Sequence, residues 1–185
     1  MPEEYMYELK IPKERVAVLI GIKGEVKKDI EATTKTTIKV DSKEGDVSVS
    51  GKDALGLYNA REVIKAIGRG FNPEVAQLLL KPDYCFEIIT ITDFAKTKVS
   101  EKRLKGRVIG AEGKSRKLIE ELTESFISVY GKTIAIISEP ETALIAKQAI
   151  ESLLNGSTHA NVYKWLEKKR REIKKRQLLG DIKNA

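Results

Sequence analysis

The chain contains an internal repeat, which restricts the fold to two copies of one structural unit. Residues 18–40 read VLIGIKGEVKKDIEATTKTTIKV, and residues 107–129 read RVIGAEGKSRKLIEELTESFISV. Aligned without a gap, the segments share these pairs: Ile20 and Ile109, Gly21 and Gly110, Gly24 and Gly113, Lys28 and Lys117, Ile30 and Ile119, Glu31 and Glu120, Ile38 and Ile127, Val40 and Val129. A common G-x-x-G inside a common apolar frame is hard to attribute to chance.

The residues around each segment predict the same order of elements, β-α-α-β-β-α, in both halves. Residues 5–11 alternate like a half-buried strand, Pro12 suits the first turn of a helix, and the glycines of 21–24 separate two helices. The predicted strands and helices that follow are 36–40, 47–49 and 53–67 in the first half, and 84–91, 100–109, 114–125, 126–130, 133–137 and 141–154 in the second. Residues 72–80 predict a short linking helix.

These elements predict an α+β chain with two tandem domains. The expected boundaries are a first domain at 1–70, a linker helix at 71–82, a second domain at 83–156 and a basic C-terminal helix or tail at 157–185.

Composition excludes several classes of function. The chain has one cysteine, Cys85, and one histidine, His159, so it forms no internal disulfide, no cysteine-rich zinc site and no histidine dyad. It has no carboxylate cluster with metal spacing and no P-loop. We therefore predict a binding protein without cofactor or metal, not an enzyme.

Charge and hydropathy indicate the kind of partner. The net charge of +7 and the pI of 9.3 imply a polyanion. No apolar run approaches the roughly 20 residues of a membrane span. The first residues lack the basic start and apolar core of a signal peptide. We expect a cytoplasmic protein that binds no membrane.

A β-α-α-β-β-α unit with I-G-x-x-G between its first two helices resembles the type I KH domain. Two such units, with GRGFNPEVAQLLL between them and SVYGKTIAII in the second, resemble the archaeal KH-domain protein of small-ribosomal-subunit assembly. This is the Dim-two, or partner-of-Nob, family, related to the Krr group. The resemblance extends from about Tyr5 to about Gly156.

The resemblance implies a protein that binds single-stranded RNA near the 3′ end of small-subunit rRNA. It implies a Nob-type endonuclease as one partner and, by weaker implication, the alpha subunit of archaeal translation initiation factor two as another. A general KH adaptor for messenger RNA or RNA-degradation machinery remains the alternative.

The chemistry of the loop suits this function, because a G-x-x-G loop clamps the backbone of about four nucleotides and the following helix directs its free N–H groups at the phosphates. The resemblance adds an aliphatic groove for the bases, with Val108 and Ile109 as its walls on the helix side and Ile127 and Val129 on the strand side. In the second copy the candidate RNA-binding residues are Arg107, Val108, Ile109, Gly110, Ala111, Glu112, Gly113, Lys114, Ser115, Arg116, Lys117, Ile127 and Val129. In the first copy they are Gly21, Ile22, Lys23, Gly24, Lys27 and Lys28. This interpretation requires that Ala111 be accessible.

Charge distribution ranks the two copies. Residues 96–117 carry nine Lys or Arg against two acids, and residues 10–39 carry eight against four. We therefore expect stronger RNA binding by the second copy, with Gly110→Asp more damaging than Gly21→Asp. An ordinary solvated basic face remains the other interpretation of residues 96–117.

Three residues depart from the usual KH pattern. Lys27 and Arg116 stand where many KH domains have an aliphatic side chain, and Glu112 places an acid inside the second loop. Arg116 is expected to contact a phosphate or to stack on a base.

The C-terminal segment, 157–185, has nine basic residues and three acids. Its composition predicts a helix over 160–179. Two interpretations are open: a solvated helix that frays at its end, or an electrostatic arm on RNA phosphates.

Overall fold

The computed structural model describes residues 5–184, and side chains up to residue 179. The ends of the predicted first domain (1–4) and of the predicted tail (185) lie outside the described residues. The chain divides into two compact units, Met1–Phe86 and Glu87–Ala185, and each is described by itself.

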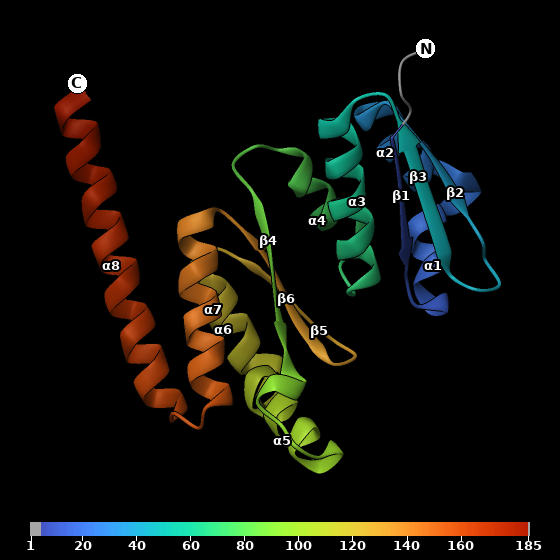
Figure 1. The fold of residues 1–185 in the computed structure, drawn as a ribbon. Coiled ribbons are helices and arrows are strands. Elements are labelled where there is room, and N and C mark those ends of the chain that lie inside the picture. The colour runs from blue at the N-terminus through green and yellow to red at the C-terminus, as the bar shows by residue number, and fades with distance from the viewer. Residues whose placement is uncertain (1–4, 185) are drawn as a thin grey trace. The chain divides into compact units, whose positions relative to one another are not determined.

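The first unit is a three-stranded antiparallel sheet with helices on one face (Figure 1). The strand order is β1-β3-β2, so β2 is an edge strand. Buried and exposed residues alternate along β2 and β3, as expected for a sheet with one covered face. Its elements are β1 (Tyr5–Lys10), α1 (Lys13–Ile20), the 3-10 turn η1 (Ile22–Gly24), α2 (Glu25–Thr34), β2 (Thr36–Val40), β3 (Asp46–Gly51), α3 (Ala54–Gly68), α4 (Pro73–Ala76) and the 3-10 turn η2 (Gln77–Leu80).

Local signals in the sequence explain these boundaries. Asp53 accepts hydrogen bonds from the N–H groups of Leu55 and Gly56 and so caps α3. The predicted linking helix over 72–80 forms as two short pieces, the α-helical turn α4 and the 3-10 turn η2. Asn72 makes no side-chain cap at its start.

The second unit repeats the arrangement, with strand order β4-β6-β5 and β5 at the edge. Its elements are β4 (Cys85–Thr90), the 3-10 turn η3 (Ile91–Asp93), α5 (Lys98–Ile109), the 3-10 turn η4 (Ala111–Gly113), α6 (Lys114–Thr123), β5 (Phe126–Tyr130), β6 (Thr133–Ser138), α7 (Pro140–Leu154) and α8 (His159–Asn184). Helix α5 begins before the predicted Ser100, because Thr97 and Ser100 form a capping box. Lys147 of α7 donates to Glu87 of β4 (2.9 Å), and this hydrogen bond raises the pKa of Lys147.

The apolar frame shared by the two repeats forms the two cores. Ile30 and Ile119 are fully buried, as are Leu19 and its counterpart Val108. Ile38 and Ile127 are 0% and 3% exposed. The prediction of an α+β chain with two β-α-α-β-β-α units and a C-terminal helix is therefore confirmed.

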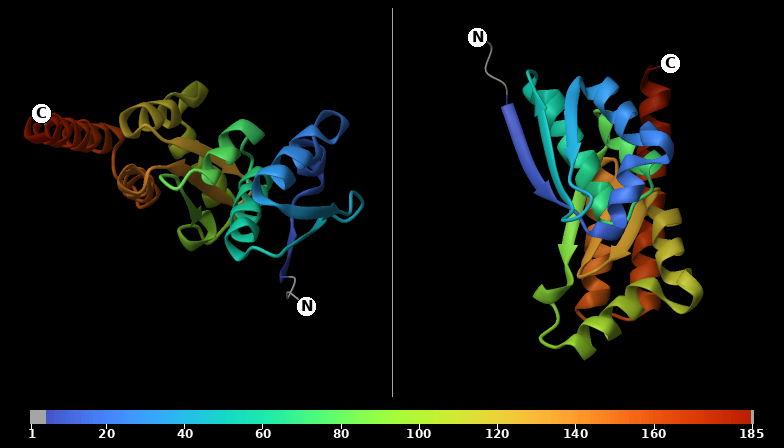
Figure 2. Two further views of the ribbon diagram at one scale, coloured as in Figure 1. Left: turned by 90° about the horizontal axis from the view of Figure 1, so that it is seen from above. Right: turned by 90° about the vertical axis from the view of Figure 1, so that its right-hand side faces the viewer.

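Helix α8 lies on α6 and α7, on the side away from the sheet (Figure 1; Figure 2, left). Val162 and Leu166 are buried at this contact, whereas the residues beyond Ile173 are exposed up to Leu179. Arg176 forms an ion pair with Glu141 at the start of α7. Among residues 5–184, no helix is long and apolar enough to cross a membrane.

Candidate nucleic-acid interface

The two G-x-x-G loops have the same backbone conformation although their central residues differ. The first glycines, Gly21 and Gly110, both have φ 74°, with ψ 178° and 174°. The second glycines, Gly24 and Gly113, have left-handed φ values of 78° and 76°. The loop geometry is therefore a property of the repeat and not of its central residues.

The two glycines of each loop differ in the space that surrounds a Cβ atom added to them. A Cβ on Gly21 would lie 2.5 Å from Cγ2 of Val26, and one on Gly110 would lie 2.6 Å from Cβ of Ser115. A Cβ on Gly113 would meet nothing within 4 Å. The first glycine thus permits close packing inside the protein, and only the second keeps the outer surface open for a phosphate.

Each second glycine also begins a helix that has no side-chain cap. Helices α2 and α6 follow Gly24 and Gly113 directly, and neither has a capping hydrogen bond from a side chain. The first N–H group of each helix donates to the preceding 3-10 turn, from Glu25 to the Ile22 carbonyl and from Lys114 to the Ala111 carbonyl. The positive end of the helix dipole lies at the same place and favours an anion. Ala111 is exposed, as the interpretation requires, and Ile22 is 80% exposed.

Each loop has two exposed basic residues, but residues 96–117 of the second unit contain fewer exposed acids than residues 10–39 of the first. Lys114 and Lys117 are exposed; Lys114 lies 3.5 Å from Glu112, but both side chains are so solvated that the pair contributes little. The exposed basic residues of the preceding segment are Lys96, Lys98, Lys102 and Arg103. The first unit offers Lys23 and Lys28 at its loop. Its Lys10 and Lys13 pair with Asp46 and Glu44.

The Arg107 side chain forms hydrogen bonds inside the protein. Its guanidinium donates to the backbone carbonyls of Leu153 (3.1 Å) and Ser157 (2.6 Å), at the end of α7. Arg15 does the same in the first unit, with carbonyls of Ile67 (2.8 Å) and Phe71 (2.5 Å). In this structure the Arg107 guanidinium is engaged in these internal hydrogen bonds, and contact of Arg107 with RNA stays a prediction.

We expect Arg107→Ala to lower the free energy of unfolding by roughly 1–2 kcal/mol, because two charge-assisted hydrogen bonds are lost. RNA affinity should change less than about twofold. Urea unfolding and fluorescence anisotropy measure the two effects. Arg103→Ala is the control, since it removes the same charge from an exposed position of the same helix. A large loss of affinity with unchanged stability would place Arg107 at the interface.

Two of the four predicted groove walls are core residues. Val108 is 0% exposed and Ile127 is 3% exposed, so their side chains are closed to a base in this conformation. Ser115 is also buried, and its hydroxyl has no hydrogen-bond partner among the described residues. Ile109 and Val129 are half-buried and remain accessible. The predicted groove is therefore narrower than expected, with one accessible aliphatic residue on each side.

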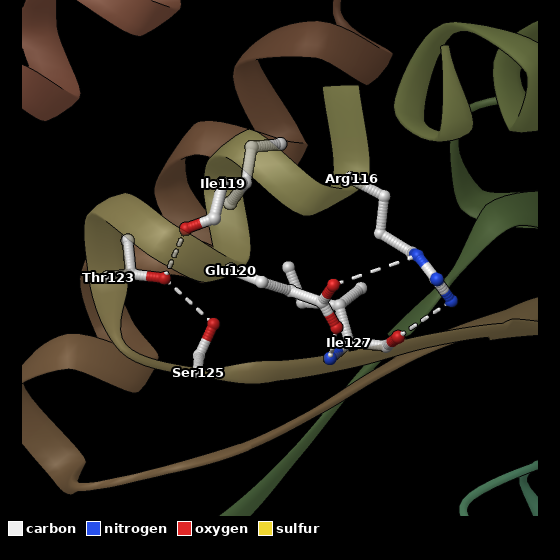
Figure 3. Close-up of polar contacts among 6 residues, drawn as sticks. All are labelled: Arg116, Ile119, Glu120, Thr123, Ser125 and Ile127. Carbon is white, nitrogen blue, oxygen red and sulfur yellow. Dashed lines mark hydrogen bonds and ion pairs between the residues drawn. The ribbon is translucent and has the colours of Figure 1, made fainter. Parts of the chain in front are cut away.

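Arg116 and Lys27 each form an ion pair with a glutamate that was not among the predicted RNA-binding residues. Arg116 lies 3.8 Å from Oε2 of Glu120 and donates to the Ile127 carbonyl at 3.4 Å (Figure 3). Glu120 in turn accepts the Ile127 N–H at 2.7 Å. In the first unit the same positions pair: Lys27 lies 3.6 Å from Glu31, which accepts the Ile38 N–H at 2.7 Å. The signal was present in the alignment, where Glu31 and Glu120 match within a basic segment.

The part of the chain that the structure describes contains no cluster of three His, Cys, Asp or Glu that could hold a metal ion. The exposed features at the loops are helix N-termini, backbone and basic side chains, together with Ile22 and the acidic Glu112. Such an arrangement is suited to an anionic chain.

Comparisons with known proteins agree with this architecture. A model described as a KH domain matches residues 6–66, and one described as a eukaryotic type KH-domain (KH-domain type I) matches residues 85–171. The KH domain-containing protein of Methanocaldococcus jannaschii is 52% identical, covering 90% of this chain and 75% of that protein. The RNA-binding protein pno1 of Dictyostelium discoideum is 29% identical, covering 87% and 70%. A chain of the a/eIF2alpha-aDim2p-rRNA complex from Pyrococcus horikoshii is 45% identical, with a TM-score of 0.85 and coverage of 91% and 96%.

The fold, the two loops and the matched models define a protein with two tandem KH domains. Within that class, the chain belongs to the Dim2/PNO1 family. The family predicted from the G-x-x-G repeats and their flanking motifs is confirmed. Membership of this family also favours a binding protein over an enzyme.

Proposed function

We propose that this chain binds single-stranded RNA near the 3′ end of small-subunit rRNA and acts in assembly of that subunit. The observation that carries the proposal is the open surface at Gly113, directly before the uncapped N-terminus of α6 and beside the exposed Lys114 and Lys117. We propose the second unit as the stronger site, because residues 96–117 contain one exposed acid, Glu112, among their basic residues, whereas residues 10–39 contain three.

Relatives support both the ligand and one partner. The Dictyostelium discoideum relative is named an RNA-binding protein, and the similar Pyrococcus horikoshii chain was solved in a complex with rRNA and a/eIF2alpha. We propose the alpha subunit of archaeal initiation factor two as a partner on this basis. A Nob-type endonuclease is the second proposed partner, and it rests on the family resemblance alone.

The test is binding of labelled single-stranded oligonucleotides by the full chain, measured by fluorescence anisotropy across a salt series. Oligonucleotides from the 3′ end of small-subunit rRNA should bind more tightly than oligonucleotides of equal length from elsewhere in that rRNA. Crosslinking in cells should enrich the same 3′ region. Equal binding of all sequences, with crosslinks spread over messenger RNA, would favour the general adaptor instead.

A further inference from the structure

Both units carry a polar clamp on an edge strand, in which a glutamate accepts a backbone N–H of the strand and pairs with a basic residue four positions before it. In the second unit this edge clamp consists of Glu120, Arg116 and the backbone of Ile127 (Figure 3). In an antiparallel edge strand, alternate residues direct their N–H and C=O away from the neighbouring strand. Ile127 is such a residue, because its N–H donates to Glu120 and not to β6. The clamp therefore occupies backbone groups that an unpaired edge would otherwise offer to a ligand.

Those backbone groups are suited to an RNA base. Unstacked bases of single-stranded RNA present donors and acceptors on their Watson–Crick edges, and an N–H beside a C=O complements such an edge. While the clamp is closed, the carboxylate takes the Ile127 N–H and the guanidinium takes its carbonyl. The next outward-facing residue, Val129, is not part of the clamp.

The clamp is not needed to join α6 to β5. Thr123 donates to the Ile119 carbonyl (2.7 Å) and hydrogen-bonds Ser125 (2.7 Å), as Figure 3 shows, and the Ser125 N–H donates to the backbone carbonyl of Glu120 (3.1 Å). These bonds fix the joint without the Glu120 carboxylate. The first unit has the same joint at Thr34 and Thr36 and also carries a clamp. The acid therefore occupies the same position in both units.

We propose that Glu120 is a specificity-determining residue that closes the Ile127 position of β5 to RNA bases and holds Arg116 away from phosphates. The inference rests on the proposed RNA-binding function and deepens it. It means that the second unit reads fewer bases, and binds RNA less tightly, than its charge and its edge strand would permit. Glu31 with Lys27 does the same for Ile38 in the first unit.

Removal of the carboxylate charge tests the proposal. Glu120→Gln keeps a side-chain oxygen that accepts the Ile127 N–H, so the chain should remain folded while Arg116 is released. We expect RNA affinity to rise about two- to fivefold, in line with the loss of a half-exposed ion pair. The slope of log K against log salt should steepen by about 0.7, the effect of one further phosphate contact on a single strand. Glu121→Gln is the control, because it removes an exposed charge one residue away.

Glu120→Ala removes the acceptor of the Ile127 N–H, so this group becomes available to RNA. The NMR resonance of the Ile127 amide reports whether RNA then contacts it. In the variant, addition of a 3′-end oligonucleotide should shift the Ile127 amide resonance; in the wild type it should leave that resonance in place. Unchanged affinity and salt slope in both variants would overturn the proposal, as would an equal Ile127 shift in the wild type. Neither result affects the proposed function, which fails only if the wild type does not bind RNA.

Discussion

Gly113→Asp is expected to weaken RNA binding by roughly ten- to a hundredfold while the second unit stays folded. A carboxylate there would stand on the open side of the loop, within a few ångströms of the bound phosphates, and two like charges about 5 Å apart repel by up to about 3 kcal/mol near a protein surface. The substitution costs about 1 kcal/mol of stability, because a non-glycine residue must adopt the left-handed conformation. Fluorescence anisotropy with a 3′-end oligonucleotide measures the effect.

Two matched variants make this experiment decisive. Gly131→Asp adds the same charge at another glycine with positive φ and open space, in the β5–β6 turn, and should leave affinity nearly unchanged. Gly24→Asp is the same change in the first unit and should weaken binding less than Gly113→Asp. Equal losses for Gly24 and Gly113 would contradict the ranking of the two units. Equal losses for Gly131 and Gly113 would show a general charge effect and remove the loop from the interface.

The repeat made the fold predictable from the sequence. Apolar positions that match between the copies, such as Ile30 with Ile119, are the positions that fill each core. Glycine, proline and capping residues placed most element boundaries within a few residues. The predicted linking helix was less accurate, because a single turn of α-helix followed by a 3-10 turn leaves the same composition as a continuous short helix.

Side-chain roles within the site were harder to predict, because they depend on distant parts of the chain. Arg107 resembles any other basic residue of its segment until the end of α7, 46 residues away, is placed beside it. Val108 and Ile109 are adjacent aliphatic residues, yet the first is in the core and the second is half-buried, because successive helical residues face different directions. Periodicity alone does not say which apolar face the sheet covers.

The sequence alone does not distinguish the two glycines of the motif, but in the structure the first is packed against the next helix and the second is open. Gly110 combines φ 74° with ψ 174°, a region open only to glycine, and its Cα faces Ser115. The aspartate substitutions expected at Gly21 and Gly110 from sequence alone would therefore confuse loss of folding with loss of binding. Gly24 and Gly113 are the positions at which binding is measured cleanly.

Gly110→Ala should accordingly destabilise the second unit by roughly 3 kcal/mol or more. Backbone strain in a glycine-only region costs about 1–3 kcal/mol, and a methyl group 2.6 Å from Cβ of Ser115 forces a shift that costs a similar amount. Trp165, the single tryptophan, lies on α8 in this unit, so its fluorescence during urea unfolding reports the loss.

Gly113→Ala is the matched control for this prediction. It has a positive φ of 76° but no atom within 4 Å of the added methyl group, so it should cost only about 1 kcal/mol. A difference of about 2 kcal/mol between the two variants is the expected result, and it separates close packing from backbone conformation. Equal destabilisation would mean that the loop moves away from α6 at little cost. The close approach of Gly110 to Ser115 would then not be the reason for glycine at this position.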